Sequence, residues 1–183
     1  MGTILKLGFF IFSGILVFYL LLPNPSFPEP PPDALQSNEP ADTETTLRRA
    51  YFTNFTREEV LVHYKNQLEK SAFLGVPLPT YRLNYPPEEA KTIIRDQTRS
   101  TFLEEIVHPL RESIFINGFE PKDPKDAIFI DEKFWRQKII VRFVPNSTLF
   151  RLAIVIPTLF LLVVIFRNWQ DSARSLFGRG KNA

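Results

Sequence analysis

The sequence contains no cysteine, and its 183 residues include only two histidines and seven glycines. Without thiols the chain has no cysteine nucleophile, no thiolate metal ligand and no disulfide. His63 and His108 alone cannot supply the three or four ligands of a metal site. The few glycines form no phosphate-binding loop, no dinucleotide fingerprint and no G-x-S-x-G motif. The sequence therefore predicts no catalytic residue, no metal site and no cofactor.

Charged residues of the two signs nearly cancel, with 22 Lys and Arg against 20 Asp and Glu. This balance leaves no basic surplus for binding nucleic acid. The distribution is uneven, because residues 23–148 hold 16 basic and 19 acidic residues, whereas the two ends together carry a net charge of +5. Membrane proteins keep basic segments in the cytoplasm. If both ends are joined to membrane spans, we therefore expect both termini in the cytoplasm and the middle of the chain outside it.

Two long apolar runs, Ile4–Leu22 and Leu149–Phe166, stand at the ends of the chain. As helices they would extend roughly 28 Å and 27 Å, close to the roughly 30 Å hydrocarbon core of a bilayer. Both are therefore predicted to span the lipid bilayer, with Pro157 kinking the second. Basic side chains near the ends can reach the headgroups, and Trp favours the interface. The predicted interface anchors are Lys6, Arg151, Arg167 and Trp169.

A cleaved signal peptide is the alternative for the first run. The residues after Leu22 offer no small-x-small cleavage site, and Pro23 and Pro25 occupy the position where a peptidase would cut. We therefore expect an uncleaved signal-anchor.

Proline dominates the segment after the first run, since seven of the 18 residues from Pro23 to Pro40 are proline. Such a composition favours an extended, solvated chain. The expected division is a transmembrane anchor at 1–22, a Pro-rich extended linker at 23–46, an α+β domain at 47–148, a transmembrane helix at 149–166 and a basic tail at 167–183.

The predicted domain begins with a helix. Thr56 and Glu59 have the spacing of a capping box, and Val60, Leu61, Tyr64 and Leu68 then fall on one helical face. A second helix is expected from the Pro-Pro-Glu-Glu sequence at 86–89 to about residue 100, because proline and acids suit the first helical turn.

The rest of the domain has the composition of strands. Ser113–Phe119 and Gln137–Val144 are rich in β-branched and aromatic residues, and the second alternates apolar and basic positions. Residues 120–126 read as a loop, and residues 128–135 as a tight hairpin. The predicted fold is α+β, with two helices on a small antiparallel sheet, flanked by two transmembrane helices.

Four stretches, YFTNFTREEV from Tyr51, RLNYPPEE at 82–89, IRDQT at 94–98 and NGFEP at 117–121, resemble those of an uncharacterised group of small two-span bacterial membrane proteins. The resemblance lies in the overall layout, and it implies no activity and no functional residue.

Acidic residues occur in four adjacent pairs, such as Glu104-Glu105. Neighbouring side chains diverge on a helix and point to opposite faces of a strand, so no pair presents two carboxylates to one substrate. A membrane-anchored hydrolase would have to use Glu59, His63 or Glu105, and this is the weakest of three hypotheses.

The leading hypothesis rests on the architecture: two membrane anchors, a stiff proline-rich tether, aromatic residues in the strand region and no catalytic set. A small domain with two helices and few strands can leave one sheet face uncovered, and that face would bind a partner. The hypothesis is a non-enzymatic membrane protein whose extracytoplasmic domain recruits or scaffolds another envelope protein. The alternative is an extracytoplasmic ligand sensor that acts through a cytoplasmic partner, and the sequence leaves assembly as a homo-oligomer open. The predicted partner-binding residues are Phe115, Phe119, Phe129, Phe134 and Trp135.

Overall fold

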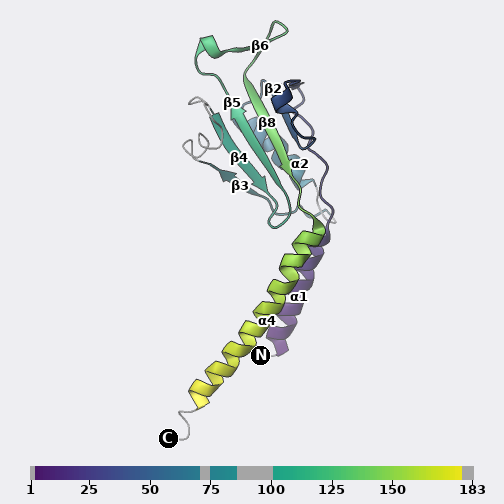
Figure 1. Ribbon diagram of the computed structural model, residues 1–183, viewed down its shortest axis with the longest axis vertical. Coiled ribbons are helices and arrows are strands. Elements are labelled where there is room, and N and C mark those ends of the chain that lie inside the picture. Colours follow the sequence, from purple (N-terminus) through teal and green to yellow (C-terminus); the bar gives the residue numbers. More distant parts are fainter. Residues whose placement is uncertain (1–2, 71–74, 86–100, 179–183) are drawn as a thin grey trace. The chain divides into compact units, whose positions relative to one another are not determined.

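The structure, a computed structural model, describes residues 3–70, 75–85 and 101–178 of the chain (Figure 1). The chain forms two compact units. One is the α+β domain, Asn24–Pro145, and the other consists of the two terminal segments, Met1–Pro23 and Asn146–Ala183. The α+β class and the antiparallel sheet agree with the prediction from the sequence.

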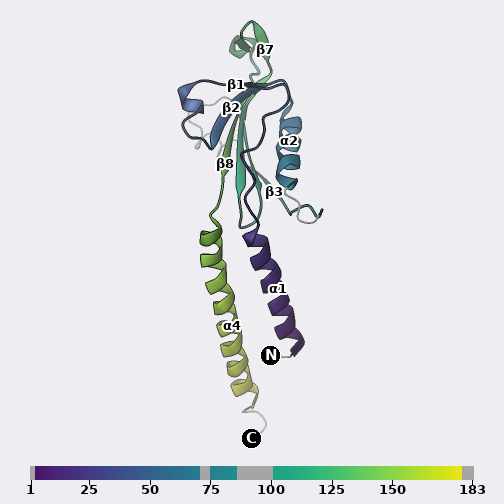
Figure 2. The same ribbon diagram turned by 90° about the vertical axis from the view of Figure 1, so that its right-hand side faces the viewer.

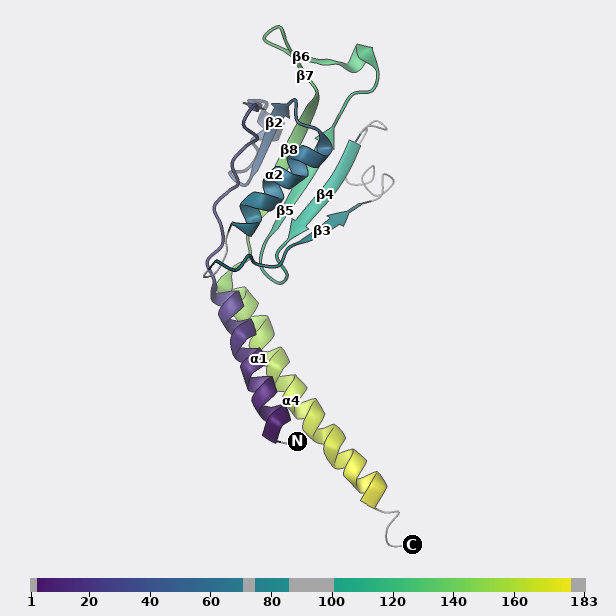
Figure 3. The same ribbon diagram turned by 180° about the vertical axis from the view of Figure 1, so that it is seen from behind.

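The terminal unit contains two apolar helices, α1 (Thr3–Leu21) and α4 (Thr148–Gly178), which pack side by side (Figure 3). Residues Thr3–Leu21 and Thr148–Ala173 are long and apolar enough to cross a membrane. This agrees with the two spans expected from the sequence, although α4 continues well past Phe166.

Arg151 joins these two helices. It lies in the first turn of α4 and is only 2% exposed. Its Nη1 donates to the carbonyl of Leu20 at 3.2 Å, and its Nη2 donates to the carbonyl of Asn146 at 2.7 Å. The Leu20 carbonyl is one of the last four of α1, which have no partner inside the helix. A cation at this position also faces the negative end of the helix dipole.

Pro157 lies inside α4, as the sequence predicts. It has no N–H, so it cannot bond the carbonyl of Ala153 four residues earlier. The Thr158 hydroxyl donates instead to the neighbouring carbonyl of Ile154, at 2.7 Å. This bond therefore lies beside the carbonyl that Pro157 leaves without its helical partner, not on it.

The domain is built on a six-stranded sheet in the order β1-β2-β8-β5-β4-β3, and every neighbouring pair is antiparallel (Figure 1). A separate two-stranded hairpin of β6 and β7 projects beyond one end of this sheet. The strands are β1 Leu35–Gln36, β2 Arg48–Thr53, β3 Tyr81–Asn84, β4 Thr101–Val107, β5 Ser113–Phe119, β6 Ile128–Ile130, β7 Lys133–Trp135 and β8 Gln137–Val144.

Helix α2 (Arg57–Glu69) covers one face of the sheet (Figures 2 and 3). The predicted capping box is confirmed, because the Thr56 hydroxyl accepts from the Glu59 N–H at 3.2 Å and the Glu59 carboxylate accepts from the Thr56 N–H at 2.7 Å. Each bond satisfies an N–H that the helix start leaves free. The buried face of α2 is the predicted one, Val60, Leu61, Tyr64 and Leu68.

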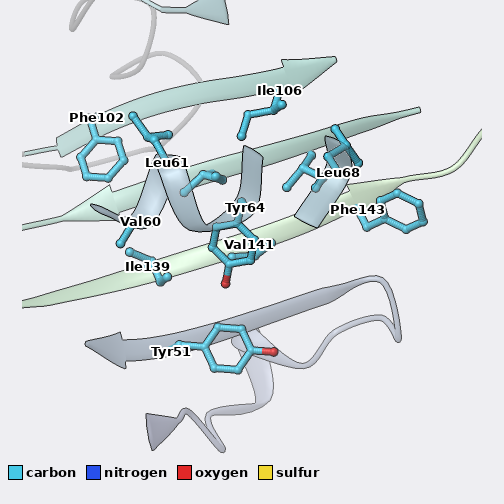
Figure 4. Packing of buried hydrophobic residues seen from close by; sticks show 12 residues of the cluster. Tyr51, Val60, Leu61, Tyr64, Leu68, Phe102, Ile106, Ile139, Val141 and Phe143 are labelled. Carbon is cyan, nitrogen blue, oxygen red and sulfur yellow. The ribbon is translucent and has the colours of Figure 1, made fainter. Parts of the chain in front are cut away.

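The hydrophobic core lies between α2 and the sheet (Figure 4). Tyr64 lies over the central strand β8 near Val141 in this core, and burial raises the pKa of its hydroxyl above the ordinary value. Phe102 packs on Gly118 of the neighbouring strand, where any Cβ would overlap the ring. The sheet residues of the core are Tyr51, Phe102, Ile106, Ile114, Ile116, Ile139, Val141 and Phe143.

The proline-rich segment differs from the free spacer that its composition suggests. Phe27 and Ala34 pack against the core, and residues 35–36 form the edge strand β1. The Asp33 carboxylate accepts from the Thr53 hydroxyl and from the Asn54 N–H, each at 2.7 Å. These contacts make the segment part of the folded domain, because apolar burial and hydrogen bonds offset the entropy lost on ordering it.

The prediction of two helices on the sheet is not matched among the described residues. One helix, α2, packs on the sheet among the described residues, and the second expected helix, at 86–100, lies outside them. The strands Ser113–Phe119 and Gln137–Val144 and the hairpin at 128–135 are confirmed. The predicted loop contains a short 3-10 turn, Pro124–Asp126.

Candidate functional site

The face of the sheet opposite α2 carries two of the aromatic residues predicted to bind a partner. Phe115 and Phe119 alternate along β5 with core residues and therefore point to this outer face. Both are half-buried, whereas the core residues between them are buried. Phe115 pairs with the exposed Arg142 of β8, and Phe119 pairs with Lys138. The outer face thus combines aromatic and basic side chains.

Lys138 holds residues 37–42 of the proline-rich segment onto this face. Its Nζ lies 2.7 Å from the Asp42 carboxylate and 2.8 Å from that of Glu39. The Ser37 hydroxyl donates to the same Asp42 carboxylate at 2.6 Å. Partial burial by itself would lower the pKa of Lys138, but the hydrogen bonds and charges of Asp42 and Glu39 outweigh it and leave the pKa raised.

The β6–β7 hairpin carries the most exposed aromatic pair of the described domain. Phe129 and Phe134 are directly opposite each other on the two strands. They are 66% and 52% exposed, and their ring centroids are 5.7 Å apart in an edge-to-face arrangement. Two adjoining aromatic rings held in water present a ready contact surface for another molecule.

The turn of this hairpin is strained. Asp131 and Glu132 are its two central residues, and they have φ values of 50° and 62°. Two-residue hairpin turns with positive φ at both positions favour Asn-Gly, because a residue with a Cβ is disfavoured there. Ile130 and Lys133, the two residues that flank this turn, are paired with each other across the two strands. Such strain persists only where the surrounding structure enforces it, and it is often found at functional sites.

The base of the hairpin is firmly attached to the domain. Trp135 is only 4% exposed, and the Lys133 ammonium lies 4.1 Å from the centre of its ring. The Arg136 N–H donates to the Asn54 side-chain oxygen at 3.0 Å, and the Arg136 guanidinium pairs with Glu120 at 2.8 Å. The exposed phenylalanines therefore stand on a base that is fixed at both sides.

A groove of about 530 Å³ opens beside the hairpin. Its apolar lining comes from Leu35, Phe52 and Ile130, and its polar lining includes Glu39 and Asp131. The volume lies in the range of small-molecule and peptide sites, roughly 300–1,000 Å³. The proline-rich segment supplies much of this lining, since residues 35–40 all contribute. A segment that composition marks as a spacer thus forms one side of the candidate site.

The five predicted partner-binding residues occupy three places. Phe115 and Phe119 lie on the outer sheet face, Phe129 and Phe134 lie on the hairpin, and Trp135 is buried at its base. Sequence reasoning missed Phe52 and Leu35, which line the groove. The signal available for Leu35 was an apolar residue within a proline-rich stretch. Binding by these residues stays a prediction.

The three candidate hydrolase residues do not form one site. The Glu59 carboxylate caps α2, and the Nε2 atom of His63 bonds the Glu29 carbonyl at 3.0 Å. Glu105 lies on the outer sheet face, away from α2, and accepts from the Tyr85 hydroxyl at 2.7 Å. The adjacent Glu104 points to the opposite face, as expected for neighbours on a strand.

A buried ionisable cluster in the turn between β4 and β5 was not anticipated. The Nδ1 atom of His108 lies 2.7 Å from the Glu112 carboxylate, and the Nε atom of Arg111 lies 3.3 Å from it. All three side chains are fully buried. The sequence signal for this cluster is the four-residue spacing of His108 and Glu112. Within the residues that the structure describes, no group of three or more His, Asp or Glu is arranged for a metal ion.

The predicted membrane-interface anchors lie on the two apolar helices. Lys6 is exposed in the first turns of α1. Arg167 and Trp169 are exposed in the second half of α4, and the Trp169 ring lies 6.1 Å from that of Phe166. Arg151 is the exception, because it is buried and bonded between the helices. Their anchoring role stays a prediction.

Comparison with known proteins found no relative of this chain. No protein-family model matches the chain, and no match was found among curated proteins or among solved structures. The resemblance to small two-span bacterial membrane proteins therefore stays a prediction, and the candidate function rests on the geometry of the domain.

Proposed function

We propose that this chain is a non-enzymatic, two-span membrane protein whose extracytoplasmic domain recruits or scaffolds another envelope protein. The observation that carries the proposal is the exposed pair of Phe129 and Phe134 on a firmly based hairpin beside a groove with both apolar and polar lining. Aromatic anchors that fill a partner's pocket contribute much of the binding energy in protein interfaces. The hairpin would insert such an anchor, while the groove would receive an extended segment of the partner.

Among the described residues, the three hydrolase candidates do not come together in one reacting site. This supports binding over catalysis by these residues. Of the hydrolase candidates, Glu59 is engaged in a helix cap, His63 bonds a backbone carbonyl, and Glu105 lies across the sheet from both. A general base must lie within hydrogen-bond reach of the group that it activates. These three residues offer no such pair.

The extracytoplasmic placement is supported by charge. The tail after Phe166 carries four basic residues against one acidic residue, whereas residues 23–148 are net acidic. Because the chain has no cysteine, single cysteines introduced at Asp123 and Ser172 report each side separately. Both positions are exposed. We expect a membrane-impermeant maleimide to label intact cells at position 123 and not at 172; the reverse pattern would place the domain in the cytoplasm.

The partner is tested by a photo-cross-linking amino acid at position 134 of the full-length protein in its native membrane. The control places the same amino acid at Val62 of α2, which is 56% exposed and distant in sequence from the hairpin. We expect one stoichiometric adduct at position 134 that Phe129→Ala diminishes, and none at position 62. Equal adducts at both positions, or none at either, would argue against recruitment by the hairpin.

A ligand sensor is the second candidate. It is favoured by the groove, whose volume suits a small molecule, and by the short chain from Val144 at the end of β8 to Thr148 at the start of α4. A sensor requires the cytoplasmic tail to pass the signal on. Removal of residues 172–183 would therefore abolish a sensor phenotype, whereas a scaffold that acts through its domain would retain function.

A further inference from the structure

Both chain segments that leave the domain start from the same end of its sheet. At the C-terminal side, Val144 pairs with Ser113 and is followed closely by Thr148, the first residue of α4. At the N-terminal side, Pro25 lines a small cavity together with Ile114, the residue next to Ser113. We call this end of the domain, which contains the β4–β5 turn, the tethered end.

The tethers are short. The chain from Val144 to Thr148 can extend at most about 14 Å, and the chain from Leu21 to Pro25 is equally long. The proline-rich segment cannot lengthen them, because Phe27 already packs against the domain core. If α1 and α4 cross a membrane, the tethered end therefore stays close to the membrane surface.

Exposed apolar side chains gather at this end. Tyr81, which is 61% exposed, begins β3 and pairs with Val107, the last residue of β4. Leu110, which is 59% exposed, lies in the following turn, and Val144, which is 37% exposed, ends β8. Val76, which is 67% exposed, lies in the described part of the connection from α2 to Tyr81.

Leu110 is the most informative of these residues. It has a φ of 61°, a left-handed conformation that usually selects glycine or asparagine. The turn is fixed by hydrogen bonds from the His108 N–H to the Glu112 carbonyl at 2.9 Å and from the Arg111 N–H to the His108 carbonyl at 3.0 Å. The buried His108–Glu112 contact supports it from inside. The fold thus holds a bulky apolar side chain outward in a strained conformation, which costs free energy in water.

We propose that the tethered end docks into the headgroup region of the lipid bilayer, with Leu110 and Val76 entering the apolar boundary and Tyr81 lying at the level of the headgroups. The inference rests on the proposed function in one respect, because it requires α1 and α4 to be membrane spans. Tyrosine favours this interface because its ring is apolar and its hydroxyl is polar. Docking holds the domain on the bilayer, and the β6–β7 hairpin, which follows the other end of β5, then faces away from it.

The experiment uses the full chain in lipid nanodiscs of phosphatidylcholine and phosphatidylglycerol, which leave both membrane surfaces open to the solvent. Single cysteines replace Leu110, Val76 and Phe134 in turn, and each carries the same environment-sensitive fluorophore. Phe134→Cys is the matched control, because Phe134 is 52% exposed at the opposite end of the domain. We expect nitroxide-labelled headgroups to quench the probes at 110 and 76 several-fold more strongly than the probe at 134. The two test positions are independent, so one misfolded variant leaves the other informative.

Equal quenching of all three probes by headgroup nitroxide would overturn the docking, and so would a blue-shifted probe at 110 that lipid nitroxide does not reach. The second result would mean that protein, rather than lipid, covers Leu110. A fourth variant, Phe160→Cys, tests separately whether α4 crosses the membrane. Phe160 is 67% exposed in the middle of the apolar run of α4. If nitroxide on the acyl chains quenches position 160 while nitroxide on the headgroups does not quench position 110, docking fails while the span stands. If position 160 is also unquenched, the membrane span itself fails.

Discussion

Arg57 of α2 donates two hydrogen bonds to one carboxylate oxygen of Glu104, a residue of β4 whose side chain is fully buried. The same guanidinium lies 5.0 Å from the centre of the Phe102 ring. Arg82 of β3 approaches the other carboxylate oxygen at 3.7 Å. A buried carboxylate is tolerated only when it is paired and hydrogen-bonded. The Arg57–Glu104 contact therefore fixes α2 on the sheet, because it compensates a charge that would otherwise be costly.

Replacing Arg57 by alanine should lower the free energy of unfolding by about 2–3 kcal/mol, less than the roughly 3–5 kcal/mol for a fully buried pair, because Arg82 remains. Arg48→Ala is the matched control, since Arg48 pairs with an exposed Glu44 and should cost at most about 1 kcal/mol. Denaturant unfolding in mild detergent, followed by near-ultraviolet circular dichroism, measures both. Similar small losses in the two variants would show that Glu104 does not depend on Arg57.

Gly118→Ala should destabilise the domain by about 1–3 kcal/mol, the usual cost of overpacking a core. The added Cβ would overlap the Phe102 ring, which packs directly on the glycine. Thermal unfolding of the full chain tests the effect. Combining Gly118→Ala with Phe102→Leu should cost less than the sum of the two single changes, and strict additivity would contradict the proposed contact.

The capping box predicts a pH dependence. Hydrogen bonds from the Thr56 backbone and hydroxyl lower the pKa of Glu59 below its ordinary value of 4.5. A carboxyl with a lowered folded-state pKa stabilises the protein above its unfolded pKa, and this contribution disappears as the pH falls through the folded-state value. Glu59→Gln should therefore lower the melting temperature at pH 6–7, and the difference from the parent should shrink below about pH 4.5. A difference that is constant with pH would rule out this source of stability.

Thr56→Ala removes the other half of the box and should cost about 1 kcal/mol at neutral pH. Helicity and thermal unfolding of the full chain measure the loss, and Thr56→Ser is the control, because serine caps helices equally well. Comparable losses in the alanine and serine variants would indicate that the hydroxyl is not what matters.

Asp33→Ala should loosen the proline-rich segment, because the Asp33 carboxylate holds both the Thr53 hydroxyl and the Asn54 N–H. Glu29→Ala is the matched control, since Glu29 contacts Gln67 through its backbone N–H and carbonyl rather than its side chain. Hydrogen exchange of residues 24–36 should accelerate at least tenfold in Asp33→Ala and stay unchanged in Glu29→Ala. A free spacer would instead exchange fast in all three proteins.

Local signals predicted the elements that local chemistry determines. The capping box placed the start of α2, and alternating β-branched and aromatic residues placed β5 and β8 at their observed bounds. Strand β4 escaped notice because two adjacent acids interrupt its apolar pattern. Their compensation by Arg57, Arg82 and Tyr85 comes from distant parts of the chain and has no local signature.

The candidate site was less predictable than the fold. The hairpin was placed correctly, but the sequence could not show that Phe129 and Phe134 face solvent while Trp135 is buried. The groove beside it was hidden by composition, since the prolines of residues 23–40 suggested a solvated chain. Phe27 and Leu35 were the apolar exceptions within that segment, and both contact the domain.

Strand β8 is the last strand of the domain to be synthesised, yet it occupies the middle of the sheet between β2 and β5. The ribosome must therefore complete residue 144 before the two halves of the sheet can be joined. Until then β2 and β5 each expose an unpaired edge, which favours aggregation. The α4 segment follows immediately, so closure of the sheet competes in time with delivery of that helix to the membrane. We expect the unfinished domain to need a chaperone during this interval, and nascent chains ending before residue 137 to be protease-sensitive.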